Sequence, residues 1–361
     1  MPAEPDDLNL ESDDDDDDPD PHLAKYRVTS YPADFTLKGY LDKYNEQQLV
    51  VPPFQRKYVW ELPRASKLIE SFLLGLPVPP VFLYKERGSR RLLVIDGQQR
   101  ILSAIKFLTN DFNDGPFRLK KVSAAWLGKS YAELPQPDKN QLNDSVLRAT
   151  IIEQLDPDDD SSIYHIFERL NTGAVSLSPM EVRKCVHFGP YFEMLEAANR
   201  LDSWREILGT TREDRRLRDV ELVLRSIAMG RGMGSYDKPV KSFLNSFLTS
   251  RRKPRLGEDP VAADRDWFTS ATARLVAILG KRPFHLRGRL NVAALDTIMP
   301  LVDAFAHGSL AVEAPQRYEL LKKNAQFVED THKSTSDKAV VLRRFELARH
   351  YLVDHPLADL A

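Results

Sequence analysis

The sequence predicts an α+β protein in which a mixed α/β domain precedes an all-helical domain. Between residues 50 and 155, short apolar runs typical of strands alternate with segments of helical periodicity. From residue 160 onward, apolar residues recur almost only at helical spacing. The polar run DPDDD at 156–160 separates the two patterns. We therefore expect a disordered acidic tail over 1–22 and domains over 23–157 and 158–361.

The first domain is predicted to contain an extended segment, a helix, a hairpin and a second helix. VVPPFQRKYVW, at 50–60, is extended because its prolines disfavour helix. A helix over 63–75 has Pro63 in its first turn and Gly75 at its C-terminal end. VFLY (81–84) and RLLVI (91–95) predict two strands, followed by a helix over 99–108. RATIIEQL, at 148–155, predicts a further short strand.

The second domain is predicted to be a series of helices. SSIYHIFERL, at 161–170, has apolar residues at helical spacing. In LSPMEVRKCV, Ser178 precedes Pro179, and Glu181 stands three residues after the serine, which is the signature of a capping box. Further helices are expected around 219–230, 240–248, 267–279, 290–306 and 337–352.

Composition narrows the class of protein. The single cysteine excludes an internal disulfide and a cysteine-based zinc cluster. No apolar run approaches the roughly 20 residues that cross a bilayer, and the N-terminus lacks the pattern of a signal peptide. We therefore expect a cytoplasmic protein without membrane contact.

Charge is distributed unevenly along the chain. Residues 1–22 hold 11 of the 53 acidic residues and no Lys or Arg, so the remainder has 42 acidic against 51 basic residues, a balance of +9. Such an acidic run repels itself and should be disordered. It is either a solubilising tail or an internal mimic of nucleic acid that screens a basic surface.

VIDGQQR, at 94–100, is the main candidate binding site because it joins a predicted strand to a predicted helix. Helix N-terminal amides favour an anion, Gly97 lets a ligand approach the backbone, and Arg100 offers a planar fork suited to phosphate. Asp96 is a candidate Mg²⁺ ligand, ribose contact or water-orienting base. Gln98 and Gln99 can form hydrogen bonds without adding charge. An ordinary turn, with Asp96 capping the helix and Arg100 on a solvated face, is equally compatible with these residues.

Further motifs accompany DGQQR in order along the chain: VPPFQRKYVW, KLIESFLLGLPVPPVFLY, LLVIDGQQRILSAIKFL, IFERLNTGAVSLSPMEVRKCV and EDRRLRDVELVLR. Together they resemble the N-terminal domain of GmrSD-type, modification-dependent restriction enzymes, which belongs to the ParB/sulfiredoxin-like superfamily. The resemblance covers about residues 35–235. It implies a ParB/sulfiredoxin-like fold for the mixed α/β N-terminal domain, with a nucleotide-binding pocket at DGQQR.

The resemblance also implies site residues and a cofactor. The expected cofactor is an NTP of unknown base with Mg²⁺, for which Asp96 is the candidate metal ligand. The catalytic candidates are Asp96, Gln99 and Arg100. The nucleotide-binding candidates are Gln55, Arg56, Asp96, Gly97, Gln98, Gln99, Arg100, Arg169 and Asn171. For Tyr58 and Trp60, core packing and base stacking both remain open, and Asn171 with Gly173 also suits a plain helix C-cap.

The nuclease part of the resembling enzymes has no counterpart in this sequence. GmrSD-type enzymes cut DNA with an HNH-type nuclease domain, fused or on a separate chain. VDHP at 353–356 is the only local look-alike, and five residues after Pro356 cannot build the required ββα frame. We therefore expect no DNA cleavage by this chain alone: either an HNH-type nuclease on a partner chain cuts, or this protein regulates or binds without cutting.

Two basic clusters, RRKPRLG at 251–257 and KRPFHLRGRL at 281–290, suit DNA phosphates or simply a solvated surface. The DNA-binding candidates are Arg251, Arg252, Lys253, Lys281, Arg282, Arg287 and Arg289. The expected function is an NTP-hydrolysing sensor or specificity component of a restriction or phage-defence system that binds DNA, modified or plain. A ParB-like DNA-binding switch or scaffold with little turnover, and a stand-alone nuclease, are the alternatives. Homo-oligomerisation is left open.

Overall fold

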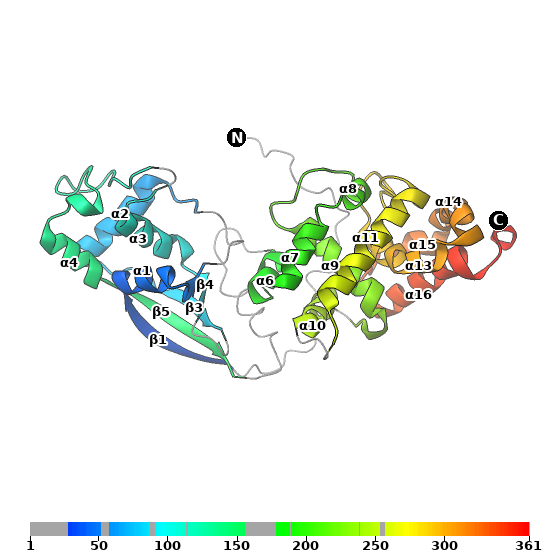
Figure 1. Cartoon of the computed structure of the whole chain (residues 1–361), viewed down its shortest axis with the longest axis horizontal. Helices are drawn as coiled ribbons and strands as arrows, with labels where there is room; N and C mark the ends of the chain where they lie inside the picture. Colours follow the sequence, from blue (N-terminus) through cyan, green and yellow to red (C-terminus); the bar gives the residue numbers. More distant parts are fainter. Residues whose placement is uncertain are drawn as a thin grey trace. The chain divides into compact units, whose positions relative to one another are not determined.

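The computed structural model describes residues 28–51, 58–86, 91–112, 115–155, 178–187, 189–237, 239–252 and 257–360. They divide into two compact units, one within 28–155 and one within 178–360 (Figure 1). The first is mixed α/β and the second is helical, which confirms the predicted α+β class. The expected domain boundary at 157 falls in 156–177, outside the described residues, and stays a prediction.

A five-stranded mixed sheet forms the base of the first unit. Its strands are β1 (Val28–Thr36), β2 (Leu49–Val50), β3 (Val81–Lys85), β4 (Leu92–Asp96) and β5 (Val146–Gln154), in the order β1-β5-β3-β4-β2. β1 runs antiparallel to β5 and β3 antiparallel to β4, whereas β3 and β5, and β2 and β4, are parallel. The strands predicted at 81–84, 91–95 and 148–155 are confirmed. β1 was not predicted from the sequence; its Pro32 is tolerated because this strand lies at the sheet edge.

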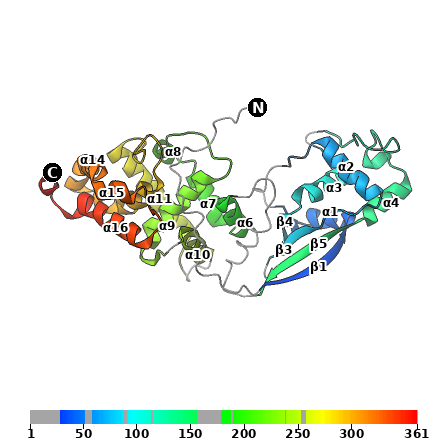
Figure 2. The same cartoon turned by 180° about the vertical axis from the view of Figure 1, so that it is seen from behind.

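The helices of the first unit lie together on one side of the sheet (Figures 1 and 2). They are α1 (Leu37–Asn45), α2 (Leu62–Leu73), α3 (Gln98–Thr109) and α4 (Gln136–Asp144). The core between helices and sheet joins Leu83 of β3 and Val94 of β4 to Ile69 of α2 and Ile105 of α3. The predicted helices at 63–75 and 99–108 are confirmed, with bounds shifted by one or two residues.

Gly75, which was predicted to end the helix over 63–75, has the backbone conformation that this role requires. Gly75 has φ +67, a left-handed conformation that glycine adopts without strain. Its N–H donates to the Phe72 carbonyl (3.1 Å), and the Leu76 N–H donates to the Ser71 carbonyl (2.8 Å). This is a Schellman motif, which satisfies carbonyls that the helix end would leave unpaired.

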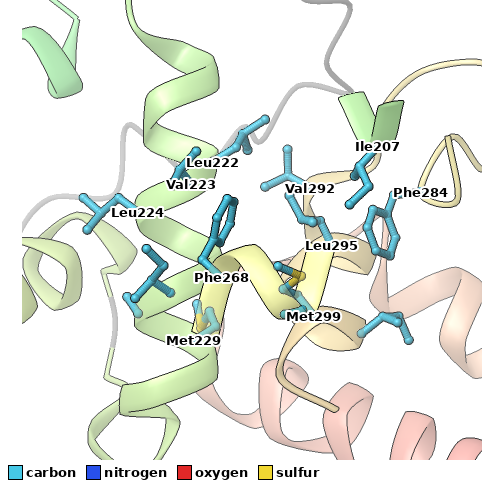
Figure 3. Packing of buried hydrophobic residues seen from close by; sticks show 14 of the residues in the cluster. Ile207, Leu222, Val223, Leu224, Met229, Phe268, Phe284, Val292, Leu295 and Met299 are labelled. Atoms are coloured by element: carbon cyan, nitrogen blue, oxygen red, sulfur yellow. The ribbon is translucent and has the colours of Figure 1, made fainter. Parts of the chain in front are cut away.

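The second unit is built from helices around one apolar core. They are α6 (Pro179–Val186), α7 (Pro190–Ala198), α8 (Asp202–Leu208), α9 (Arg218–Gly232), α10 (Val240–Arg252), α11 (Pro260–Leu279), α12 (Val292–Ile298), α13 (Val302–Phe305), α14 (Gly308–Lys323), α15 (Ala325–Asp330) and α16 (Lys338–Arg349). Figure 3 shows buried side chains of α8, α9, α11 and α12, with Phe284, meeting in this core. Among the helices of the described segments, none is long and apolar enough to span a membrane.

Of two helix predictions in this unit, one is confirmed and the other is wrong. The capping box of α6 is confirmed: the Glu181 N–H donates to Ser178 Oγ (3.1 Å) and the Ser178 N–H donates to Glu181 Oε2 (2.5 Å). The single helix predicted over 290–306 is wrong. α12 ends at Ile298, a 3₁₀ turn occupies Met299–Leu301, and α13 follows. Pro300 lies in that turn, and it lacks the N–H that a continuous α-helix would need there.

Of the buried aspartates among the described residues, four bind arginines more than ten positions away in the sequence. Each carboxylate is at most 3% exposed, and each pair joins a helix or loop to another part of the unit. The pairs are Asp219 with Arg205 (2.8 Å), Asp264 with Arg251 (2.8 Å), Asp296 with Arg225 (2.6 Å) and Asp330 with Arg343 (2.5 Å). Loss of one partner of a buried pair costs about 3–5 kcal/mol, because it leaves a charge without its partner.

Candidate functional site

A β-bulge sets the position of Asp96 at the end of β4. Phe82 of β3 lies opposite Asp96, but Leu83 lies opposite Val94, so Ile95 is an extra residue in β4. Val94 and Ile95 are both buried, which breaks the usual alternation along a strand. Bulges redirect the side chains that follow them. Here the bulge leaves the Asp96 carboxylate 42% exposed at the turn into α3.

Gly97 is the only residue type that fits this turn. Its φ of +95 lies in the left-handed region. A Cβ at this position would lie 2.3 Å from Val81 Cγ1, so any side chain would collide with the start of β3. Gly97 is the N-cap of α3, and no side-chain cap is found for this helix among the described residues. The alternative in which Asp96 caps the helix is therefore not what the structure shows.

Arg100 pairs with Asp96 across one helical turn. Its Nη2 donates to Asp96 Oδ2 (2.9 Å) and to the Pro80 carbonyl (3.2 Å). The Arg100 side chain is only 19% exposed, so it does not lie on a solvated face. Its Nε is buried and has no hydrogen-bond partner within the described part of the chain. An anion at this turn would therefore compete with Asp96 for the guanidinium, and a shift of the side chain could give Nε an acceptor.

Gln99 ties a distant segment to the start of α3. Its Oε1 accepts hydrogen bonds from the backbone N–H groups of Val59 (3.0 Å) and Trp60 (3.2 Å). Ser103 Oγ donates to the Gln99 carbonyl (2.6 Å) and lies 2.7 Å from the Tyr58 hydroxyl. Residues 58–60 are thus fixed beside the turn. The Gln99 side chain, predicted to be catalytic, has its acceptor oxygen occupied by the protein itself.

The structure brings together part of the predicted nucleotide site. Asp96, Gly97, Gln98, Gln99 and Arg100 form one strand–turn–helix, as expected. Two further segments of the predicted site lie outside the described residues: 52–57, with Gln55 and Arg56, and 156–177, with Arg169 and Asn171. The segment 52–57 continues directly into residues 58–60, which Gln99 holds at the turn.

The ring of Tyr58 packs in the core. It meets Phe112 edge to face, with 5.6 Å between ring centroids, and its hydroxyl bonds to Ser103. Burial raises the pKa of Tyr58. Trp60 carries the guanidinium of Arg64 4.5 Å from its ring centroid. Core packing is thus the role of Tyr58, and Arg64 occupies one face of Trp60.

Several groups at the turn were missed from the sequence. The Val59 and Trp60 amides and the Pro80 carbonyl are backbone groups, so no side-chain pattern marks them. Only Arg64 had a local signal, its spacing of four residues from Trp60 at the start of a helix.

Asp96 offers one carboxylate for a metal ion. Among the residues that the structure describes, no group of three or more His, Cys, Asp or Glu side chains could hold a metal ion. Mg²⁺ commonly binds through one or two carboxylates together with phosphates and water. The single carboxylate of Asp96 therefore fits an Mg²⁺ ion that arrives with a nucleotide.

Some of the predicted DNA contacts are engaged within the protein. Arg251 Nε donates to the buried Asp264 (2.8 Å), and the Arg251 guanidinium lies 4.4 Å from the Phe247 ring centroid. Lys281 pairs with Glu206 (2.9 Å). These two cations are therefore partly neutralised where they stand.

The other five candidates differ in their surroundings. Arg252 is exposed at the end of α10, and Lys253 lies outside the described residues. Arg282, Arg287 and Arg289 are exposed on the loop that connects α11 to α12. Most of the exposed candidates for DNA binding therefore lie on that loop.

Comparison with known proteins adds one finding. Residues 37–188 match a family model described as the GmrSD restriction endonuclease, N-terminal domain. The match begins with α1, contains the turn at 96–100 and extends through α6. Comparison of the chain with curated proteins gives no match.

Proposed function

We propose that this chain, whose residues 37–188 match the model of the GmrSD N-terminal domain, is a component of a DNA restriction or phage-defence system. In this proposal it binds and hydrolyses an NTP with Mg²⁺ at the turn 96–100, in the cytoplasm. It senses DNA, plain or modified, and acts with a nuclease carried by another chain. The observation that carries the nucleotide part is the N-terminus of α3, where the N-cap is a glycine, beside Arg100.

The turn has the physical properties that a phosphate group requires. The N–H groups of the first helical turn point out of the helix, and the helix dipole adds about half a positive charge there. Because the N-cap is Gly97, it has no side chain of its own that could accept hydrogen bonds from these amides. Arg100 adds a guanidinium whose donors suit phosphate oxygens in pairs. Each of these groups favours an anion at the same place.

The ion pair between Asp96 and Arg100 suggests how binding and hydrolysis are linked. A phosphate that takes the Arg100 guanidinium displaces the Asp96 carboxylate, which now accepts from Nη2 at 2.9 Å. The released carboxylate can then contact a metal-bound water or orient the attacking water. Mg²⁺ held by the nucleotide supplies charge neutralisation of the phosphates.

A nucleotide switch with little turnover is the second candidate function. It is favoured by the single carboxylate at the turn and by the ion pair that engages it. Binding at α3 needs neither Asp96 nor a general base, whereas hydrolysis needs an oriented water. The two functions therefore predict the same affinity and different rates of phosphate release.

Phosphate release by the full-length protein tests the proposal. With Mg²⁺, we expect release from at least one of the four common NTPs, and a loss of about a hundredfold or more in Asp96→Ala and Arg100→Ala. Arg118→Ala is the matched control, because Arg118 is an exposed arginine of the same unit that pairs with Glu133. In the same mixtures, plain and hydroxymethylated plasmid DNA should remain uncut.

The possible results separate the candidates. Binding without release supports the switch. Failure of all four NTPs to bind or be hydrolysed contradicts both candidates, and nicking that disappears in Asp96→Ala would make the chain a nuclease.

A further inference from the structure

A basic loop of the helical unit, residues 281–289, is firmly anchored. Phe284 within it and Leu290 after it are fully buried. The Tyr318 hydroxyl donates to the Pro283 carbonyl (3.1 Å), and the Asn291 N–H donates to the Phe284 carbonyl (2.9 Å). The loop therefore has one defined conformation, and its exposed side chains project from a fixed backbone.

Three cations of this loop face solvent. Arg282, Arg287 and Arg289 are exposed, and no acidic side chain of the described residues pairs with them. Gly288, with φ +81, forms the turn between the last two. Lys281 differs from these arginines, because Glu206 neutralises it. The loop thus carries an excess of positive charge that the described residues do not neutralise.

A second loop, residues 209–217 between α8 and α9, is anchored from inside the unit. The Asp219 carboxylate is fully buried and accepts from Arg205 Nη1 (2.8 Å), Asn199 Nδ2 (2.8 Å) and the Asp214 N–H (3.0 Å). Arg205 Nε in turn donates to the Thr210 carbonyl (2.9 Å). This network explains the motif EDRRLRD as a scaffold for the loop, on which Arg212 and Arg215 are exposed.

The two loops adjoin at the C-terminal end of α8. Gly209, with φ +71, begins the second loop, and a Cβ there would lie 2.9 Å from Arg282 Cγ, Cδ and Nε. The Arg282 side chain therefore lies against the Gly209 backbone. The Arg282 N–H also donates to the Glu206 carbonyl (3.1 Å), near the end of α8. The exposed Arg212, Arg215, Arg282, Arg287 and Arg289 form what we call the double-loop surface.

We propose that the double-loop surface docks the sugar–phosphate backbone of DNA. The cations that carry the proposal, Arg282, Arg287 and Arg289, are exposed and follow one another along one loop, which suits a row of phosphates better than one small anion. Phosphate contacts of this kind are independent of base sequence and strongly dependent on salt. Because both loops are already ordered, binding sacrifices little conformational entropy. The identity of the polyanion as DNA rests on the proposed function.

The surface differs from the one expected from sequence. It includes Arg212 and Arg215 and leaves out Arg251, which the buried Asp264 engages. Sequence could not show this, because the two loops are about 70 residues apart and are brought together by the fold, where Arg282 lies against Gly209.

The test compares two double variants of the full-length protein. Arg287→Ala with Arg289→Ala removes two cations of the surface. Arg265→Ala with Arg349→Ala removes the same charge from the same unit, at arginines that pair with Asp266 and Asp354. Binding to a fluorescein-labelled duplex of arbitrary sequence is followed by anisotropy from about 50 to about 200 mM salt.

For the surface variant, the slope of log K against log salt should become shallower by about 0.9 for each phosphate that the protein no longer neutralises. If Arg287 and Arg289 each neutralise one phosphate, the decrease in affinity should be about tenfold larger at the low-salt end than at the high-salt end. The control variant should keep the slope of the original protein. Arg287→Lys with Arg289→Lys should also keep it, because a point charge is enough to neutralise a phosphate.

Three results overturn the proposal: no DNA binding by the original protein at low salt, an unchanged slope in the surface variant, or an equal decrease of affinity in both variants. NTP binding serves as the separate readout. It should be unaffected in the surface variant, and its absence from every protein would contradict the nucleotide function while leaving the double-loop surface supported by its own slopes.

Discussion

Gln99 differs from its neighbours in the turn because its acceptor oxygen already binds two backbone amides, of Val59 and Trp60. If its task is to hold residues 58–60, Gln99→Glu should keep NTP affinity, since a carboxylate oxygen accepts from the same amides. Gln99→Ala should weaken the affinity and loosen the segment. If the Gln99 amide instead donates to phosphate, Gln99→Glu should weaken the NTP affinity, because a carboxylate repels phosphate. Titration with a fluorescent nucleotide, with thermal melting alongside, distinguishes the two roles.

The sequence predicted where this turn lies, but it did not predict the ion pair and the hydrogen bonds within it. Gly97 between an apolar run and a helical stripe marks a strand–turn–helix, because few residues other than glycine adopt its backbone conformation. The pairing of Arg100 with Asp96 was not predicted, because i,i+4 spacing fits an ion pair as well as it fits a phosphate-binding Arg100 beside a metal-binding Asp96. The partners of Gln99 are backbone groups about 40 residues away, which no local pattern can indicate.

At the scale of an element, α6 ends in a buried histidine. His187 is its C-cap, and burial, with Arg252 and Arg183 nearby, lowers the pKa of His187 to about 3. The unfolded chain binds this proton near pH 6.5, so folding excludes it between about pH 6.5 and about pH 3. Stability should therefore fall as pH drops through that window, by at most about 1.4 kcal/mol per pH unit from this group.

Urea unfolding of the original protein and His187→Gln between about pH 7 and about pH 4.5 measures this contribution. The free energy of unfolding should depend less on pH in the variant. His307→Gln, at a position that is not buried, is the control and should follow the original protein. Parallel pH profiles for all three proteins would contradict a buried neutral His187.

Helix ends were predicted correctly where the residues that mark them lie next to those ends. The capping box of α6 and the glycine after α2 lie within a few residues of the ends they define. β1 has no such signal: most of its residues are Thr, Ser, Pro, Ala or Asp, and it is held by pairing with β5 along its whole length. Pro300 indicates the break, but the apolar residues on both sides of it keep helical spacing, and this spacing predicted one continuous helix.

At the scale of the whole molecule, charge is divided between an acidic N-terminal run and a basic remainder, −11 against +9. If the run competes for the cations that bind DNA, deletion of residues 1–22 should strengthen DNA binding at low salt. The effect should shrink as salt rises, since the Debye length is about 10 Å at 0.1 M. A variant with the acidic residues of 1–22 changed to Asn and Gln controls for length. Equal affinity with and without the run would make it a solubility device.

The buried aspartate–arginine pairs also constrain how this sequence can evolve. A domain has about 5–15 kcal/mol of stability, and breaking one such pair removes about 3–5 kcal/mol. A single substitution at Asp296 or Arg225 is therefore a step into a poorly folded intermediate, whereas replacement of both by apolar residues of similar volume can be nearly neutral. Relatives of this protein should accordingly keep or replace the two partners together, so that positions on different helices covary even though neither has a catalytic role.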